Sequence, residues 1–149
     1  MRLLVQRVRS AEVVVEGACI GKIGSGLLVF LGIHKADTEK DVDYLIPKLV
    51  NLRIFSDSQG KMNKSLLEVQ GAALVVSQFT LYGNCDTGRR PDFLASANRT
   101  VAEPLYEAFL RALSSFPITL ATGKFGVHME VALVNDGPVT MIIESRSFS

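Results

Sequence analysis

The stretch that decides the fold is VQRVRSAEVVVEGACIGKIGSGLLVFLGI, at residues 5–33. It is rich in Val, Ile and Leu, and glycines interrupt it at Gly17, at Gly21 and within residues 24–26. Aliphatic and β-branched residues favour strands, and closely spaced glycines mark the turns between them. The pattern therefore predicts consecutive antiparallel strands joined by short turns.

Helical spacing of apolar residues appears twice further along the chain. The first set runs through residues 42–50, and Asp37 and Thr38 offer helix caps before it. Pro47 lies inside this set, and it should kink the helix or limit its regular part because its ring removes a backbone hydrogen bond. A second helix is predicted at about residues 102–114.

The remaining apolar segments read as strands. AALVVSQFTL at residues 72–81 suits a buried strand, and TLATGKF at 119–125 suits another. HMEVALVN and VTMIIES give two more strands, joined across Asp136-Gly137-Pro138. The order of strands, helix, strands, helix and strands, without a repeat or a linker, predicts one α+β domain over residues 1–149. Its sheet should be mainly antiparallel, with two main helices.

Charge and cysteine content narrow the class of protein. The formal net charge is +1, so an RNA partner would be contacted over a small part of its surface. Cys19 and Cys85 form no CxxC pair and are interpreted as reduced thiols. The amino-terminal residues do not resemble a signal peptide, and no segment approaches the roughly 20 apolar residues of a membrane span. We therefore expect a soluble, cytoplasmic protein with no membrane partner.

Residues of the usual catalytic types are few. His34 and His128 are too few for a three-histidine zinc site, and they are interpreted as a structural and a solvent-facing residue. The sequence also has no GxSxG elbow, no GxGxxG and no GxxxxGK[ST]. We therefore expect neither a metal nor another cofactor.

Two motifs are candidates for function. SQFTL at residues 77–81 ends an apolar strand with hydroxyls and an amide, which either present donors to a developing oxyanion or satisfy the strand end itself. NDGPVT at residues 135–140 reads as an ordinary turn, but a Gly-Pro bond is a candidate for the cis form. A cis bond would turn both flanking carbonyls to one side, where they would recognise an α-amino group. TGRRP at residues 87–91 fits either a phosphate contact or a solvated loop.

Together these segments resemble the D-aminoacyl-tRNA deacylase family. SQFTL and NDGPVT match the two signature motifs of the family residue for residue. The similarity spans nearly the whole chain, through residues 6–8, 53–63, 88–93 and 122–131. Tyr82 stands where a small residue is common in the family, and Asp92 stands where Ser is frequent.

The resemblance implies a fold, a reaction and a partner. The fold is an antiparallel, barrel-like α+β domain, and the protein is a homodimer with cross-subunit active sites. The reaction is hydrolysis of the ester between a D-amino acid and the 3′-terminal adenosine of tRNA. Glycine is also accepted, including glycine mischarged on tRNA(Ala). The partner is aminoacyl-tRNA rather than DNA, and the enzyme proofreads translation.

The resemblance also assigns residue roles. Gly137 and Pro138 correspond to a Gly-cis-Pro motif that rejects L-amino acids in the site of the partner subunit, and Arg7 corresponds to the arginine that fixes its orientation. Met129 falls where the site closes on the side of the adenosine. The pocket around the ester corresponds to Ser77, Gln78, Phe79 and Thr80.

The mechanism of the catalytic step depends on whether Thr80 acts as a nucleophile. Its hydroxyl is a candidate nucleophile, but no base is evident beside it in the sequence. We therefore expect RNA-assisted hydrolysis, in which the terminal ribose 2′-OH helps to organise the attacking water. Three alternatives stay open: a related animal deacylase that acts on L-alanine through a Gly-trans-Pro, a non-catalytic module that binds an RNA end or an amino acid, and a metabolic protein for free D-amino acids.

Overall fold

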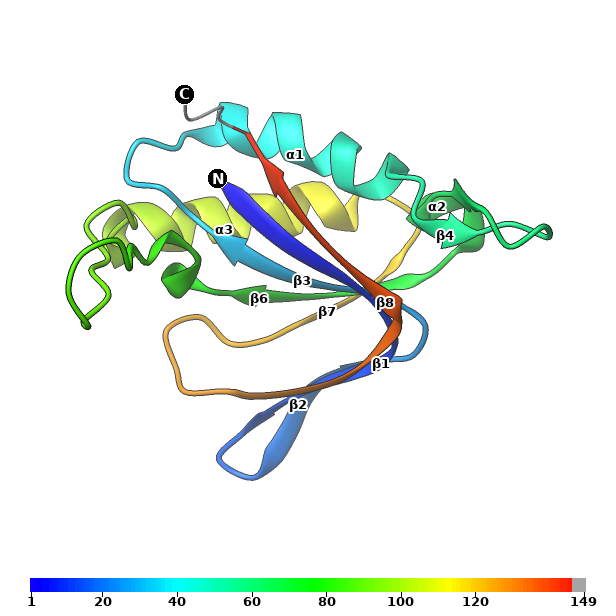
Figure 1. The fold of residues 1–149 in the computed structure, drawn as a ribbon, viewed down its shortest axis with the longest axis horizontal. Coiled ribbons are helices and arrows are strands. Elements are labelled where there is room, and N and C mark those ends of the chain that lie inside the picture. Colours follow the sequence, from blue (N-terminus) through cyan, green and yellow to red (C-terminus); the bar gives the residue numbers. More distant parts are fainter. Residues whose placement is uncertain (146–149) are drawn as a thin grey trace.

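One curved sheet carries the fold in the computed structural model, which describes residues 1–145 (Figure 1). Its central strand is β1 (Arg2–Val15). Along one edge, the first half of β1 pairs with β3 (Gly26–Gly32) and the second half with β2 (Ala18–Ile23). Along the other edge β1 pairs throughout with β8 (Glu130–Glu144). All three pairings are antiparallel. Residues 5–33 predict antiparallel strands, but β2 and β3 both pair with β1 and not with each other, as they would in a meander.

The other two strands of this sheet run parallel to β3. Helix α1 (Glu39–Asn51) connects β3 to β6 (Ala72–Ser77), and α3 (Arg99–Ser114) connects β6 to β7 (Thr119–Thr122). The pairings β3–β6 and β6–β7 are parallel. Parallel neighbours need a long crossover, which the two helices provide. The sheet is therefore mainly antiparallel with a parallel edge, which the sequence pattern did not indicate.

The two main helices lie close to their predicted positions. The Thr38 side chain caps α1 in a capping box with Asp41, and the helix continues through Pro47. Helix α3 begins three residues before the predicted start, because the Asn98 side chain accepts from the N–H of Val101 and caps it. No helix within residues 1–145 is long and apolar enough to cross a membrane. The remaining elements are short: β4 (Phe55–Ser56), β5 (Met62–Lys64), α2 (Leu66–Val69) and the 3-10 helix η1 (Phe79–Tyr82).

The main core lies between the sheet and the helices. Alternate residues of β1, including Leu3 and Val5, point toward α1 and α3 and are buried with Leu49 and Phe109. Residues between them point to the opposite face. There Leu4 pairs with Phe30 on one side and with Ile142 on the other, and Ile142 is 63% exposed. This row of three apolar side chains crosses a face that the helices do not cover.

Strand β8 differs from the prediction. The sequence indicated two strands joined across Asp136-Gly137-Pro138, whereas residues 130–144 form one strand that pairs with β1 on both sides of that segment. Asn135 pairs with Val8 and Thr140 with Gln6, so residues 136–139 all stand opposite Arg7. Four residues opposite one make a special bulge, larger than the usual two opposite one. The turn signal is real but local, and the long pairing with β1 overrides it.

Gly26 provides a test of the parallel pairing. A Cβ at Gly26 would lie 1.9 Å from the carbonyl oxygen of Ala72 on β6, so Gly26→Ala must push the two strands apart. We expect a loss of about 1–3 kcal/mol in the free energy of unfolding, measured by urea denaturation at one fixed protein concentration. Gly24→Ala is the matched control, because nothing lies within 4 Å of its added Cβ. Its effect should stay within about 0.5 kcal/mol, and equal effects of the two substitutions would contradict the pairing.

Candidate active site

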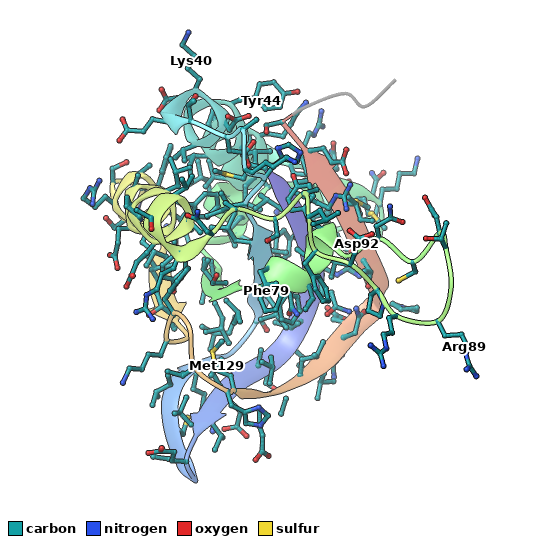
Figure 2. All side chains as sticks on the ribbon, turned by 90° about the vertical axis from the view of Figure 1, so that its left-hand side faces the viewer. Lys40, Tyr44, Phe79, Arg89, Asp92 and Met129 are labelled. Atoms are coloured by element: carbon teal, nitrogen blue, oxygen red, sulfur yellow. The ribbon has the colours of Figure 1, made fainter. Side chains whose placement is uncertain are left out.

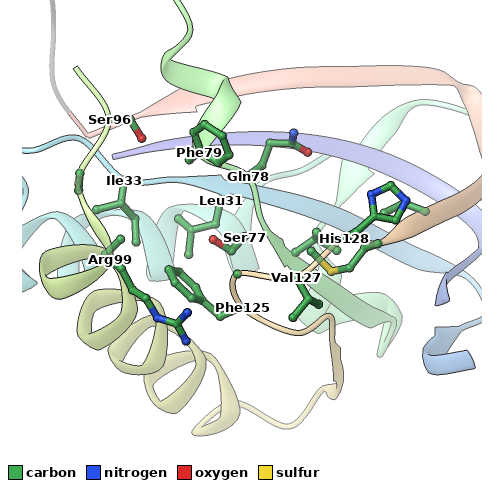
Figure 3. A pocket seen from close by; sticks show the side chains of 16 residues that line it. Leu31, Ile33, Ser77, Gln78, Phe79, Ser96, Arg99, Phe125, Val127 and His128 are labelled. Atoms are coloured by element: carbon green, nitrogen blue, oxygen red, sulfur yellow. The ribbon is translucent and has the colours of Figure 1, made fainter. Parts of the chain in front are cut away.

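A cavity of about 560 Å³ opens where β6 ends (Figure 3). Three segments of the chain line it: the last residues of β6 with the start of η1, the start of α3 with the residues before it, and the segment that precedes β8. The side chains that these segments contribute include Ser77, Gln78, Phe79, Ser96, Arg99, Phe125, Val127, His128 and Met129. Four predicted site residues are therefore among its walls: Ser77, Gln78, Phe79 and Met129.

The backbone at the end of β6 explains why polar groups face this cavity. Ser77 is the last residue of the strand, and the N–H of Gln78 makes a final bond of 2.8 Å to the carbonyl oxygen of Leu31. The chain then turns into η1. The N–H groups of Phe79 and Thr80 stand in its first turn, where a helical N–H has no carbonyl partner within the helix. They are suited to donate to an oxygen atom of a ligand.

Phe79 and Thr80 are both exposed beside the cavity. Phe79 meets the ring of Phe93 edge to face, with centroids 5.1 Å apart. This contact fixes an aromatic wall at the rim, of a kind on which a base or another planar group can stack. The hydroxyl of Thr80 accepts a hydrogen bond from the Gln78 side-chain amide. An amide that donates cannot take the proton of the hydroxyl, so this contact does not activate Thr80 as a nucleophile.

Tyr82, one of the two residues at which the sequence departs from the motifs that it resembles, is buried beside SQFTL. Its ring packs against His34, with centroids 5.3 Å apart, and the Arg2 guanidinium lies 4.7 Å from the ring centroid. Within residues 1–145 its buried hydroxyl has no hydrogen-bond partner. Burial raises the pKa of this hydroxyl above its ordinary value, so it stays protonated near neutral pH. Tyr82 is therefore a packing residue and no general base.

The cavity is also lined by two residues to which the sequence assigned no role: Arg99, and Phe125 within the matched segment 122–131. Phe125 packs against Tyr106 of α3, with ring centroids 5.5 Å apart, and the Arg99 guanidinium lies 5.5 Å from the Phe125 centroid. Arg99 also donates to Glu103 one helical turn later. This bond holds the pKa of Glu103 below its ordinary value. The positions of Phe125 and Arg99 depend on how α3 packs on the sheet. Residue spacing in the sequence does not encode that packing.

The basic loop projects from the same rim. Asn84 and Asp92 exchange two backbone hydrogen bonds, of 2.8 and 2.9 Å, which close the base of the loop. Figure 2 shows Asp92 near that base and Arg89 at the far end, pointing away from Phe79. Arg89 and Arg90 are exposed. Neither lines the cavity.

The second motif is a rigid, exposed bulge on β8. The Gly137–Pro138 peptide bond is cis, and both residues are exposed. The Arg7 side chain is only 11% exposed, and its Nε donates to the carbonyl oxygen of Asp136 at 2.9 Å. Its Nη1 donates to the carbonyl oxygen of Ile54 at 2.7 Å. Arg7 thus fastens the bulge to the segment that follows α1.

The two motifs do not meet within one chain. Ser77 is level with Leu31 and Leu3, whereas the bulge stands opposite Arg7, four residues further along β1. Three strand spacings also separate β6 from β8, through β3 and β1. Spacings of about 3.3 Å along a strand and 4.8 Å between strands place the motifs roughly 19 Å apart. Arg7, Gly137 and Pro138 are absent from the walls of the cavity.

The acidic and metal-ligating residues do not form a cluster. Among residues 1–145, no group of three or more His, Cys, Asp or Glu side chains is placed to hold a metal ion. The polar groups that the cavity offers are hydroxyls, an amide, backbone N–H groups and the exposed His128.

The family model of D-Tyr-tRNA(Tyr) deacylase matches residues 4–144 of the sequence. The chain belongs to this family. Its relatives include a D-aminoacyl-tRNA deacylase of Thermosipho africanus (strain TCF52B), 53% identical over 98% of both chains. Another is a D-aminoacyl-tRNA deacylase of Desulfatibacillum aliphaticivorans, 56% identical over 98% of this chain and 100% of the relative. Membership places the chain among hydrolases.

Two solved structures share the deacylase fold. One is described as a c-Myc DNA unwinding element binding protein, with a TM-score of 0.93, 42% identity and coverage of 99% of this chain and 100% of that chain. The other is described as a probable eukaryotic D-amino acid tRNA deacylase, with a TM-score of 0.83. At 17% identity, over 96% of this chain and 98% of that chain, it supports the fold alone. The predicted single-domain, barrel-like α+β fold is confirmed as that of the deacylase family.

Proposed function

We propose that this protein hydrolyses the ester that joins a D-amino acid to the 3′-terminal adenosine of tRNA, and that it spares L-aminoacyl-tRNA. The observation that carries the proposal is the cavity at the end of β6, where SQFTL supplies unpaired N–H donors beside an aromatic wall. Backbone N–H donors beside the scissile ester can stabilise the oxyanion that forms during its hydrolysis. Phe79 on one side and Met129 on the other suit a stacked adenine.

Chirality is checked by the main chain of Gly137 and Pro138 in this proposal. Their carbonyls hold the α-amino group and leave no room for the Cβ of an L-residue, whereas a D-side chain points outward. Rejection by a steric clash discriminates further than the loss of a favourable contact. Glycine has no Cβ, so glycyl-tRNA, including glycine mischarged on tRNA(Ala), is also a substrate. The enzyme would proofread aminoacyl-tRNA in the cytoplasm.

The site is completed by a second copy of the chain in this proposal. A separation of roughly 19 Å within one chain keeps Gly137 away from Ser77, by the strand spacings of the sheet. The bulge is exposed on β8, beside the uncovered apolar row that ends at Ile142. Pairing two such faces about a two-fold axis buries the row of each protomer and brings each bulge toward the cavity of its partner.

Three esters test the proposal, and L-alanyl-tRNA and free D-tyrosine test the alternatives. We expect fast ester cleavage of D-tyrosyl-tRNA and glycyl-tRNA and little cleavage of L-tyrosyl-tRNA, measured by release of the labelled amino acid. Cleavage of L-alanyl-tRNA in preference to the D-ester would favour the animal-type deacylase instead. Binding of all three without turnover would favour a non-catalytic module, and turnover of free D-tyrosine would favour a metabolic role.

Catalysis is proposed to use the RNA itself. The ribose 2′-OH adjoins the ester and organises the attacking water, while the N–H groups of Phe79 and Thr80 stabilise the oxyanion. The hydroxyl of Thr80 already accepts a bond from Gln78 and has no base beside it in this contact. His128 is exposed at the rim.

Side-chain and substrate changes separate the RNA-assisted mechanism from nucleophilic catalysis. Thr80→Ala and His128→Gln should each keep kcat within about tenfold of the wild type, since neither side chain carries the chemical step. A tRNA that ends in 2′-deoxyadenosine should be hydrolysed at least about a hundredfold more slowly. Single-turnover assays measure these rates. Loss of all activity in folded, dimeric Thr80→Ala would overturn the mechanism.

Mixed dimers test the cross-subunit site. Gly137→Ala should inactivate, because its φ of +150° suits few L-residues and the added Cβ would lie 2.7 Å from the Val139 nitrogen. Ser77→Phe should inactivate by filling the cavity. In a mixed dimer one site carries both changes and the other neither, so equal mixing should restore about a quarter of wild-type activity. Mixed dimers that stay inactive after verified subunit exchange would exclude a shared site.

A further inference from the structure

The side chain of Asn135 spans the bulge that carries Gly137 and Pro138. Its Oδ1 accepts from the N–H of Val139 at 2.8 Å, and its Nδ2 donates to the carbonyl oxygen of Val139 at 3.1 Å. Both backbone groups of one residue are thus bound by one amide. The residue before the bulge is thus held to the last residue of the bulge, and Gly137 and Pro138 between them are exposed.

We call the contact of the Asn135 amide with the backbone of Val139 the Asn135 clamp, and two further contacts extend it. The Nδ2 of Asn135 also lies 3.1 Å from Oγ1 of Thr140, which accepts from Nε2 of Gln6 at 3.2 Å. On the other flank, Arg7 holds the carbonyl oxygen of Asp136. Each side of the bulge therefore has its own polar support, and Gly137 and Pro138 lie between the two supports with their surfaces exposed.

The chemistry of this clamp requires an amide of this length. Asp would keep the acceptor for the Val139 N–H, but it would place a carboxylate oxygen against the Val139 carbonyl oxygen, where Nδ2 now donates. Two acceptors in that position repel each other. Ala would remove all three bonds. No strand ladder substitutes for them, because β8 pairs with β1 at Asn135 and at Thr140 but not at residues 136–139.

We propose that Asn135 is the positioning residue for chiral selection: its amide sets where the Gly137 and Pro138 carbonyls lie, and thereby how closely an L-Cβ is excluded. This inference rests on the proposed function, in which those carbonyls meet the α-amino group. Asn135 touches neither the ester nor the amino group. Its effect passes entirely through the main chain of residues 136–139.

Selection by a clash is sensitive to small displacements. Shifts on the order of 1 Å change rates by about a hundredfold when groups must be placed accurately. A loosened bulge therefore admits L-substrates before it stops hydrolysis altogether. A merely structural role of Asn135 would instead lower the activity on every substrate in proportion to the loss of folded dimer.

The test compares three esters in one variant. In Asn135→Asp we expect the kcat/KM for L-tyrosyl-tRNA relative to that for glycyl-tRNA to rise roughly tenfold or more, because glycine has no Cβ to exclude. The kcat/KM for D-tyrosyl-tRNA should fall. The ratio of the L-ester to the glycyl ester does not depend on the amount of active enzyme, so partial misfolding leaves it unchanged.

Two matched variants complete the experiment. Asn51→Asp makes the same exchange at an exposed amide that donates to the carbonyl oxygen of Pro47 in α1, and it should leave the ratio at the wild-type value. Thr140→Val removes only one of the three bonds of Asn135 and should raise the ratio by a smaller factor. If Asn135→Asp does not fold, the ratio measured for Thr140→Val tests the role of Asn135 instead.

An unchanged ratio in folded Asn135→Asp, or in Thr140→Val where the Asp variant does not fold, would overturn this inference alone. A wild-type enzyme without any preference for the D-ester would overturn the proposed function and this inference with it.

Discussion

The course of β8 depends on which hydrogen-bond acceptors one buried arginine finds. Arg7 lies in the middle of β1, and its guanidinium is almost fully covered. A buried guanidinium must find acceptors, since an unpaired charge in that position costs several kcal/mol. The carbonyl oxygens of Asp136 and Ile54 provide them. Both lie outside the regular ladder, so the arginine imposes the irregular course of β8 and ties it to the segment that follows α1.

The pairing of β1 with β8 on either side of Arg7 fixes the position of the bulge. Leu3 and Val5, before Arg7, are buried toward the helices. Val13, after Arg7, is buried in a second apolar cluster, and a shift of one residue would turn these side chains outward. The register of β1 with β8 is therefore fixed on both sides of the bulge, and its three extra residues have no way to spread along the strand. They leave the plane of the sheet at one point. The position of Gly137 is thus determined by core packing several residues away.

Much of this architecture could be predicted from the sequence. Glycine spacing in residues 5–33 indicates the antiparallel strands, because turns and aliphatic runs are local signals. The apolar set from Val42 to Val50 is buried in α1 as its spacing predicts. Polar residues that interrupt an apolar run identified SQFTL as a strand end, and β6 does end at Ser77. The predicted strand continued to Leu81, where the structure instead has η1.

The remaining features depend on contacts between distant segments. Nothing within AALVVS specifies that its neighbour is β3 in parallel orientation. The DGP segment has the composition of a turn, and only the complementary length of β1 makes β8 continuous. Phe125 and Arg99 reach the cavity because α3 docks beside it, and no motif spacing connects them. Local patterns therefore identify the motifs, and the sheet determines where each motif points.

The chemistry of the cavity makes accurate positioning the main contribution of the protein. Thr80 accepts a bond from an amide, and burial raises the pKa of the Tyr82 hydroxyl, so neither provides a base at neutral pH. If the attacking water is organised by the substrate, the protein contributes orientation and oxyanion donors, which supply a large part of many rate enhancements.

Such a site hydrolyses any ester that it orients correctly. Selectivity must then come from excluding the wrong substrate before it is oriented. A rigid main-chain bulge, braced by Arg7 on one flank and Asn135 on the other, is suited to that exclusion because it has no flexible side chain that could yield.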